Sequence, residues 1–279
     1  MLLIISSTPL SLGHSFSSNE SAVFLALVKA IKTEAQLVLE NLANNNTALA
    51  SEHANRASAL ITASVHGRIA ESNLTLADDL SNVLSTLRSS TESSSDASTA
   101  SDIDIVISDL DAIIDGIIAA RIDPDQLDNS TIQALTIVEL LDRVLINYGD
   151  AYEVGFDMTN MSMMIGDNSN GMNSMSPMEM DSNNNNMSMA NTSATEGFEL
   201  VNITSYQTAQ VLATKVQELF NSQLSNSSAD TQSLDNIATA LQELVSTMYN
   251  RGSPNDVMMI VHTKIHPNFI TAFGLEFST

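Results

Sequence analysis

The chain has 279 residues and a formal net charge of −23 at pH 7, because 33 acidic side chains outnumber 10 basic ones. This balance excludes binding to a nucleic-acid backbone or to an anionic membrane surface, since both need clustered Lys and Arg side chains. The absence of Cys excludes disulfides, thiolate catalysis and Cys-ligated metal sites. With 43% apolar but only 4% aromatic residues, we expect cores built from Ala, Leu, Ile and Val.

Residues 1–15 have the features of a signal peptide for export. Leu2–Leu12 is an apolar run of the length of a signal-peptide h-region, and Gly13-His14-Ser15 offers a cleavage site with small residues. The run is too short to span a bilayer, and the basic residues that usually precede it are missing. We therefore expect an extracytoplasmic or secreted protein with no integral membrane span.

Asn-x-Ser/Thr triplets, the acceptors of N-linked glycans, occur at nine positions. They are consistent with an exported protein, although an Asn- and Ser-rich composition also produces such triplets by chance. The nine acceptors are Asn19, Asn45, Asn73, Asn129, Asn160, Asn186, Asn191, Asn202 and Asn226.

Apolar residues recur every three or four positions through residues 16–152, which is the period of amphipathic helices. The pattern predicts an N-terminal helical bundle, with a Ser/Thr-rich loop at residues 88–100 and Gly149 as a left-handed cap after the last helix. In the fourth helix, β-branched residues also allow a strand, but the helical spacing is favoured. The predicted helices cover residues 18–43, 47–69, 73–87, 103–117 and 131–148.

The same period returns in residues 201–279 and predicts a C-terminal helical unit, with helices at residues 204–224 and 233–250. Ser253 then caps a further helix with Pro254 in its first turn, and Pro267 ends or interrupts it. No segment alternates like a strand. The sequence therefore predicts an all-α protein of helical bundles, with a disordered Met/Asn/Ser-rich insert at residues 153–200.

The stretch from Met158 to Met189 is the strongest chemical signal in the chain. It holds 10 of the 14 Met residues and no Lys, Arg, Phe, Tyr or Trp, and most of the remainder is Asn and Ser. Such a sequence forms neither an amphipathic helix nor a packed strand, so we expect its thioethers to have no core to fill. The ten residues are Met158, Met161, Met163, Met164, Met172, Met175, Met178, Met180, Met187 and Met189.

Thioether sulfur is a soft, neutral ligand that selects Cu(I) over harder divalent ions. Because thioethers need no deprotonation, we expect this stretch to bind Cu(I) even in acid. Asp157, Asp167, Glu179 and Asp181 add a negative potential that attracts cations. The stretch resembles the Met-rich loops of exported copper-resistance and copper-transport proteins, in which M-x-M and M-x-x-M units hold Cu(I) or Ag(I).

Three other interpretations of the methionine-rich stretch remain open. It is also consistent with a low-complexity linker that binds nothing. Exposed Met is readily oxidised to the sulfoxide, so the stretch could serve as an oxidant sink. Flexible Met side chains could also form an adaptable apolar contact surface.

His262 and His266 are the histidines best suited to join a metal site, because an i,i+4 spacing places two imidazoles on one helical face. Pro267 disfavours the helical conformation at His266, so a helix-end or packing role competes with metal binding. For His53 we expect a surface or interhelical hydrogen bond.

No catalytic constellation is found, since the sequence contains no P-loop, Rossmann, G-x-S-x-G or H-E-x-x-H motif. The acidic run at residues 123–129 has oxygen ligands for Ca²⁺ but lacks the EF-hand order, and helix capping by Asp128 or Asn129 explains it more simply. We therefore expect a protein that is not an enzyme.

The run Val257–Leu275, with the helical pairs before it, resembles a group of secreted helical proteins of ammonia-oxidising archaea that have no firm activity. The resemblance implies an extracytoplasmic archaeal setting, in which copper is a central nutrient. The leading hypothesis is capture or buffering of Cu(I) outside the membrane by the methionine-rich stretch. The alternative is a cell-surface structural or interaction protein, whose helices bind a protein partner and whose methionine-rich stretch is a linker.

Overall fold

A computed structural model describes residues 18–92, 98–160 and 198–275. All regular secondary structure in these ranges is helical, which confirms the predicted all-α fold. The predicted signal peptide and residues 161–197 of the predicted insert lie outside the described ranges. No helix within these ranges is both long enough and apolar enough to cross a membrane.

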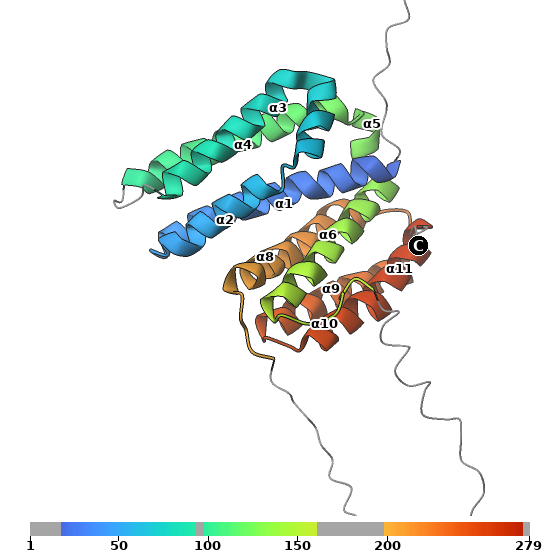
Figure 1. The fold of residues 1–279 in the computed structure, drawn as a ribbon. Helices are drawn as coiled ribbons and strands as arrows, with labels where there is room; N and C mark the ends of the chain where they lie inside the picture. Colours follow the sequence, from blue (N-terminus) through green and yellow to red (C-terminus); the bar gives the residue numbers. More distant parts are fainter. Residues whose placement is uncertain (1–17, 93–97, 161–197, 276–279) are drawn as a thin grey trace, which may run out of the picture.

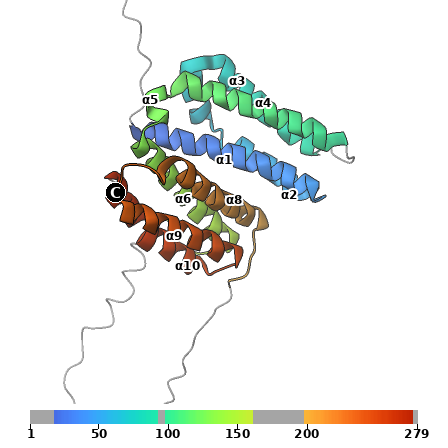
Figure 2. The ribbon, with the colours of Figure 1, turned by 180° about the vertical axis from the view of Figure 1, so that it is seen from behind.

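The helices are stacked in successive layers (Figures 1 and 2). α3 and α4 form one outer layer and pack on α1 and α2, which in turn pack on α6 and α8. The other outer layer contains α9, α10 and α11. In chain order the elements are α1 (Ser18–Ala43), α2 (Thr47–Ala59), α3 (Ala63–Glu92), α4 (Ser98–Arg121), α5 (Pro124–Leu127), α6 (Ser130–Ala151), α8 (Ile203–Leu219), the π-turn η1 (Phe220–Leu224), α9 (Thr231–Tyr249), α10 (Pro254–Ile260), the π-turn η2 (Val261–Ile265) and α11 (His266–Phe273).

Capping side chains mark several helix starts where the sequence predicts them. α3 kinks at Asn73, whose backbone is extended and whose Oδ1 accepts a hydrogen bond from the N–H of Leu76 at 3.2 Å. Asn129 caps α6 in the same way, which confirms the capping interpretation of the acidic run. Ser253 caps α10, and Pro254 lies in its first turn, as predicted.

Two predicted boundaries differ from the structure. The helix predicted at residues 47–69 is two helices, because a break at residues 60–62 separates α2 from α3. Thr62 marks the second start, since its Oγ1 accepts a hydrogen bond from the N–H of Val65 at 3.2 Å. The loop predicted at residues 88–100 is shorter, because α3 extends to Glu92 and α4 begins at Ser98.

Buried apolar side chains form two separate clusters. The first is built mainly from α1 to α4 and includes Ile31, Leu84 and Ile114. The second is built mainly from α6 and from α8 to α11, and it includes Leu141 and Phe220. α6 therefore contributes mainly to the second cluster, although its Ile132 belongs to the first, whereas the sequence-based division after residue 152 assigns α6 to the N-terminal bundle.

Buried and half-buried polar side chains join α1 and α2 to α6 and α8, and we call this layer the polar seam. Its centre is Glu34, which is 4% exposed and accepts hydrogen bonds from His53 Nδ1 at 2.6 Å, Arg56 Nε at 3.0 Å and Thr208 Oγ1 at 3.0 Å. The interhelical hydrogen bond expected for His53 is thus confirmed. The polar seam consists of Glu34, Asn41, His53, Arg56, Asn147, Ser205, Gln207 and Thr208.

Hydrogen bonds across the polar seam hold the His53 ring in one orientation. Asn41 Nδ2 donates to the carbonyl of Leu37 at 2.8 Å, and its Oδ1 accepts from Gln207 Nε2 at 3.3 Å. This orients Gln207 Oε1 toward His53 Nε2, 3.0 Å away. His53 Nδ1 lies 2.6 Å from a carboxylate oxygen of Glu34, so the ring is held between Glu34 on α1 and Gln207 on α8.

The chain segments that flank residues 161–197 are held at one carbonyl group. The carbonyl oxygen of Ala151, at the end of α6, accepts hydrogen bonds from the N–H groups of Val201 at 2.9 Å and Asn202 at 3.0 Å. The side chain of Asn202 then caps α8 by accepting from the N–H of Ser205 at 3.0 Å. α6 and α8 therefore form a helix hairpin with a long insertion between them.

Replacement of residues 161–197 by a Gly/Ser linker of about 12 residues should leave the fold intact, because the flanking segments are fastened to each other. We expect the free energy of unfolding in urea to change by less than about 1 kcal/mol, the scale of the change in loop-closure entropy. Circular dichroism would verify the helix content. A loss of more than about 3 kcal/mol would instead mean that the replaced residues contribute to the cores.

Candidate functional site

Three of the predicted metal ligands lie in the described part of the chain, and they lie close together. Met158 follows α6, His262 lies in η2, and His266 begins α11. The backbone carbonyl oxygen of Met158 is 2.9 Å from Nε2 of His262. The other predicted ligands lie outside the described residues; they are Met161, Met163, Met164, Met172, Met175, Met178, Met180, Met187 and Met189.

The side chain of Met158 is buried in the second cluster, with 2% relative exposure. Gly149 provides the space, because a Cβ at Gly149 would lie 3.2 Å from Met158 Sδ and 3.1 Å from Val154 Cγ2. The expectation that these thioethers have no core to fill is therefore wrong for Met158, which is a packing residue. The prediction of Gly149 as a left-handed cap is also wrong, since α6 continues to Ala151 and the left-handed residue is Glu153, with φ 48°.

His262 and His266 lie on one face of a continuous helix despite Pro267. Their ring centroids are 5.1 Å apart and the rings are nearly perpendicular, at 84°. Before Pro267 the helix widens into the π-turn η2, in which the N–H of His266 bonds to the carbonyl of Val261. This turn is the predicted interruption, and the wider turn accommodates a residue that has no N–H to donate.

The hydrogen bond to Met158 fixes the tautomer of neutral His262. A carbonyl oxygen can only accept, so Nε2 is the donor and Nδ1 keeps its lone pair. Burial, with a smaller contribution from the charge of His262, lowers the pKa of His266 to about 4. Neutral imidazole is the form that ligates metals, and the lowered pKa favours that form at His266.

Three carboxylates interact electrostatically at the same corner of the fold. Burial, together with smaller contributions from repulsion by Glu139 and Asp157, raises the pKa of Asp142 to about 6. Hydrogen bonds from the hydroxyl and N–H of Thr159, at 2.7 and 2.9 Å, lower the pKa of Asp157, and His262 contributes to the lowering. Asp157 therefore places a negative charge near His262, which favours a cation there.

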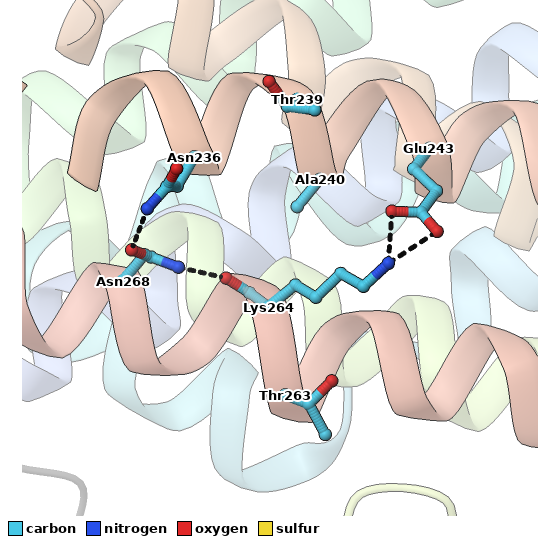
Figure 3. Close-up of a pocket in the computed structure, with 7 residues that line it drawn as sticks. All are labelled: Asn236, Thr239, Ala240, Glu243, Thr263, Lys264 and Asn268. Atoms are coloured by element: carbon cyan, nitrogen blue, oxygen red, sulfur yellow. Dashed lines mark hydrogen bonds and ion pairs between the residues drawn. The ribbon is translucent and has the colours of Figure 1, made fainter. Parts of the chain in front are cut away.

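A groove of about 330 Å³ lies between α9 and the helix formed by η2 and α11 (Figure 3). Lys264 Nζ is 2.7 Å from both carboxylate oxygens of Glu243, and Asn236 Nδ2 donates to Asn268 Oδ1 at 3.1 Å. Because these side chains bind one another across the groove, we interpret it as a bridged helix interface. Within the described ranges, no three His, Asp or Glu side chains converge in a way that could hold a metal ion.

The polar seam is not predicted from the sequence, although one signal for it is present. Glu34 lies between Ile31 and Val38 on the apolar stripe of the first helix, where a charged residue indicates a buried partner. Its partner Thr208 is 174 residues away, so no local pattern reveals the pairing. The seam side chains are hydrogen-bonded to one another and Glu34 and His53 are buried, which favours a structural role.

The chain matches no family model, no curated protein and no solved structure. Its function must therefore be argued from the chemistry of its own residues.

Gly149→Val should displace the side chain of Met158, because the added methyl groups overlap the space that its sulfur occupies. Overpacking of this kind costs about 1–3 kcal/mol. We expect Met158 to resist oxidation by hydrogen peroxide in the wild type and to oxidise several-fold faster in the variant, as measured by peptide mass spectrometry. Gly67→Val is the control, since a Cβ at Gly67 has no neighbour within 4 Å. Continued protection of Met158 in the variant would contradict this packing.

Asp142→Asn should stabilise the fold at neutral pH and have little effect in acid. The pKa of Asp142 is raised from 3.8 to about 6 in the folded chain, so the folded state binds this proton more tightly than the unfolded state. The resulting stability is present below about pH 4 and is lost as the pH rises through about 6. The shift corresponds to at most about 3 kcal/mol, which solvent screening reduces to about 1–2 kcal/mol.

Thermal unfolding of both proteins at about pH 4 and about pH 7.5 measures this difference. The variant must be compared with the wild type at each pH, because His266 gives both proteins a pH dependence of stability that opposes that of Asp142. The lowered pKa of His266 gives stability that is lost as the pH falls from 6.5 to about 4. Asp109→Asn, at an exposed position of α4, is the control. A variant less stable than the wild type at the higher pH would contradict the prediction.

Proposed function

We propose that this protein captures or buffers Cu(I) outside the cytoplasm through the methionine side chains between Met161 and Met189. The observation that carries the proposal is the concentration of nine thioethers in a stretch without any Phe, Tyr, Trp, Lys or Arg. Two or three such soft, neutral ligands satisfy the low coordination number of Cu(I). Met158 is not part of this ligand set, because its sulfur is buried.

The architecture of the helical body supports the proposal. The flanks of the insertion are fastened at the carbonyl of Ala151. An insertion attached in this way can vary in sequence at little cost to the cores. Such tolerance does not by itself favour any residue type, whereas ligation of a soft metal favours thioethers.

The charge and the absence of Cys also favour this function. A net charge of −23 attracts cations, and a chain with only 10 basic residues offers little competing repulsion. Thiolates bind Cu(I) more strongly but are oxidised in an oxidising compartment, whereas thioethers remain ligands there and in acid. A methionine-based site is thus suited to the extracytoplasmic location that we propose.

A competition titration with Cu(I) under anaerobic conditions, at about pH 5.5, tests the proposal. It compares the wild type with a full-length variant in which the nine methionines from Met161 to Met189 are changed to Leu. We expect the wild type to bind on the order of three equivalents and the ninefold variant to lose all but at most one, because Leu has no sulfur to donate.

Met248→Leu combined with Met258→Leu is the matched control, because both residues are buried in the second cluster. This double variant should bind as much Cu(I) as the wild type. Equal stoichiometry in the wild type and the ninefold variant would reject the proposal, and the interpretation of the stretch as a linker would replace it.

A further inference from the structure

We propose that His262, His266 and Met259 form a second Cu(I) site, located on the helical body and built without the methionines between Met161 and Met189. The three residues lie along the continuous helix made by α10, η2 and α11. This inference rests on the proposed function only for the identity of the metal, because its ligands and geometry come from the described residues.

The two imidazoles are close enough to share one metal ion. A metal bound about 2.0 Å from an imidazole nitrogen lies about 3.1 Å from the ring centroid. The centroids of His262 and His266 are 5.1 Å apart, which is less than twice that distance. Two imidazoles leave room for a further ligand on the ion, so the His pair calls for a third one.

Met259 is the residue placed to supply that ligand. It lies three residues before His262, a spacing that brings side chains together on one helix face, and it is 42% exposed. Because helical side chains lean toward the N-terminus, we expect the ring of His262 to be directed toward the turn that carries Met259. Among the described methionines, Met158, Met248 and Met258 are buried, so their sulfur atoms are committed to the core.

The surroundings of His262 have the arrangement that orients metal-binding histidines. Such a histidine donates its other ring N–H to a carbonyl or carboxylate, which fixes the tautomer and the ring orientation. Here Nε2 of His262 donates to the carbonyl of Met158, so Nδ1 is the nitrogen available to the metal. The packing of Met158 against Gly149 holds that carbonyl in place.

The ligand set favours Cu(I) over Zn²⁺. Two imidazoles and one thioether are neutral, and three ligands satisfy Cu(I), whereas Zn²⁺ prefers four and gains from anionic ones. Asp157, which interacts electrostatically with His262, adds negative charge near the site.

Nuclear magnetic resonance of the ¹⁵N-labelled, full-length ninefold Met→Leu variant tests this site without the methionine-rich ligands. Cu(I) is diamagnetic, so one equivalent can be followed through the imidazole nitrogen resonances. We expect Nδ1 of His262 and one ring nitrogen of His266 to shift. His53, paired with Glu34, and His66, beside Asp78, should not shift and serve as internal references.

Met259→Leu in the same background should weaken Cu(I) binding about tenfold, as loss of a ligand or its support typically does. Met258→Leu, which changes the neighbouring buried methionine, is the matched control and should bind like its parent. The site is overturned if the resonances of His262 and His266 do not move, if His66 moves equally, or if Zn²⁺ at the same concentration gives the same shifts.

The outcomes for the two proposals are distinguishable. If the wild type binds several equivalents of Cu(I) but the two histidines never respond in the ninefold variant, the proposed function stands and the second site falls. If the histidines bind one equivalent while the wild type and the ninefold variant have equal stoichiometry, the second site stands and the methionine-rich stretch is not a copper site.

Discussion

The hydrogen bonding of the buried Glu34 carboxylate is the interaction on which the relative placement of the helices depends. A carboxylate removed from water costs several kcal/mol unless it is paired and hydrogen-bonded. The donors that satisfy Glu34 on α1 come from α2 and α8, so they reach it only when these helices have one particular register. Apolar side chains tolerate small rearrangements with a modest loss of stability. The polar seam therefore selects one arrangement of two clusters that could otherwise pack in several ways.

The polar seam also stabilises the helix ends from which the long insertion leaves. Asn147 lies in the last turns of α6, and Ser205 lies in the first turn of α8; both bind Arg56 of α2. On the N-terminal side of the insertion, the side chain of Met158 packs in the second cluster and its carbonyl oxygen is hydrogen-bonded to His262. The insertion is thus attached to a rigid base at both ends. A metal-binding stretch on such a base could take up or release an ion without any change in the cores.

The sequence predicts those features that depend on local patterns. The helices follow from apolar spacing, and their starts at Asn73 and Ser253 follow from capping chemistry. The prediction of Gly149 as a left-handed cap is wrong, although glycines near helix ends often adopt that conformation. Here the lack of a Cβ at Gly149 makes room for the sulfur of Met158. The pairing of Glu34 with Thr208 spans 174 residues, so no window of sequence contains it. The i,i+4 spacing of His262 and His266 predicts that they share a helix face, but no sequence pattern predicts the π-turn that keeps them there.

Burial divides the methionines of the described ranges into two groups that composition does not separate. Met258 and Met259 are adjacent, yet the first is fully buried in the second cluster and the second is 42% exposed. By sequence Met158 belongs to the methionine-rich stretch, but its sulfur packs in the core and only its carbonyl reaches His262. If the second site binds Cu(I), Met158 contributes to it through the backbone, by orienting an imidazole. Counting sulfur atoms therefore gives only an upper limit to the thioether ligands, because a methionine can ligate only where its side chain is left outside the core.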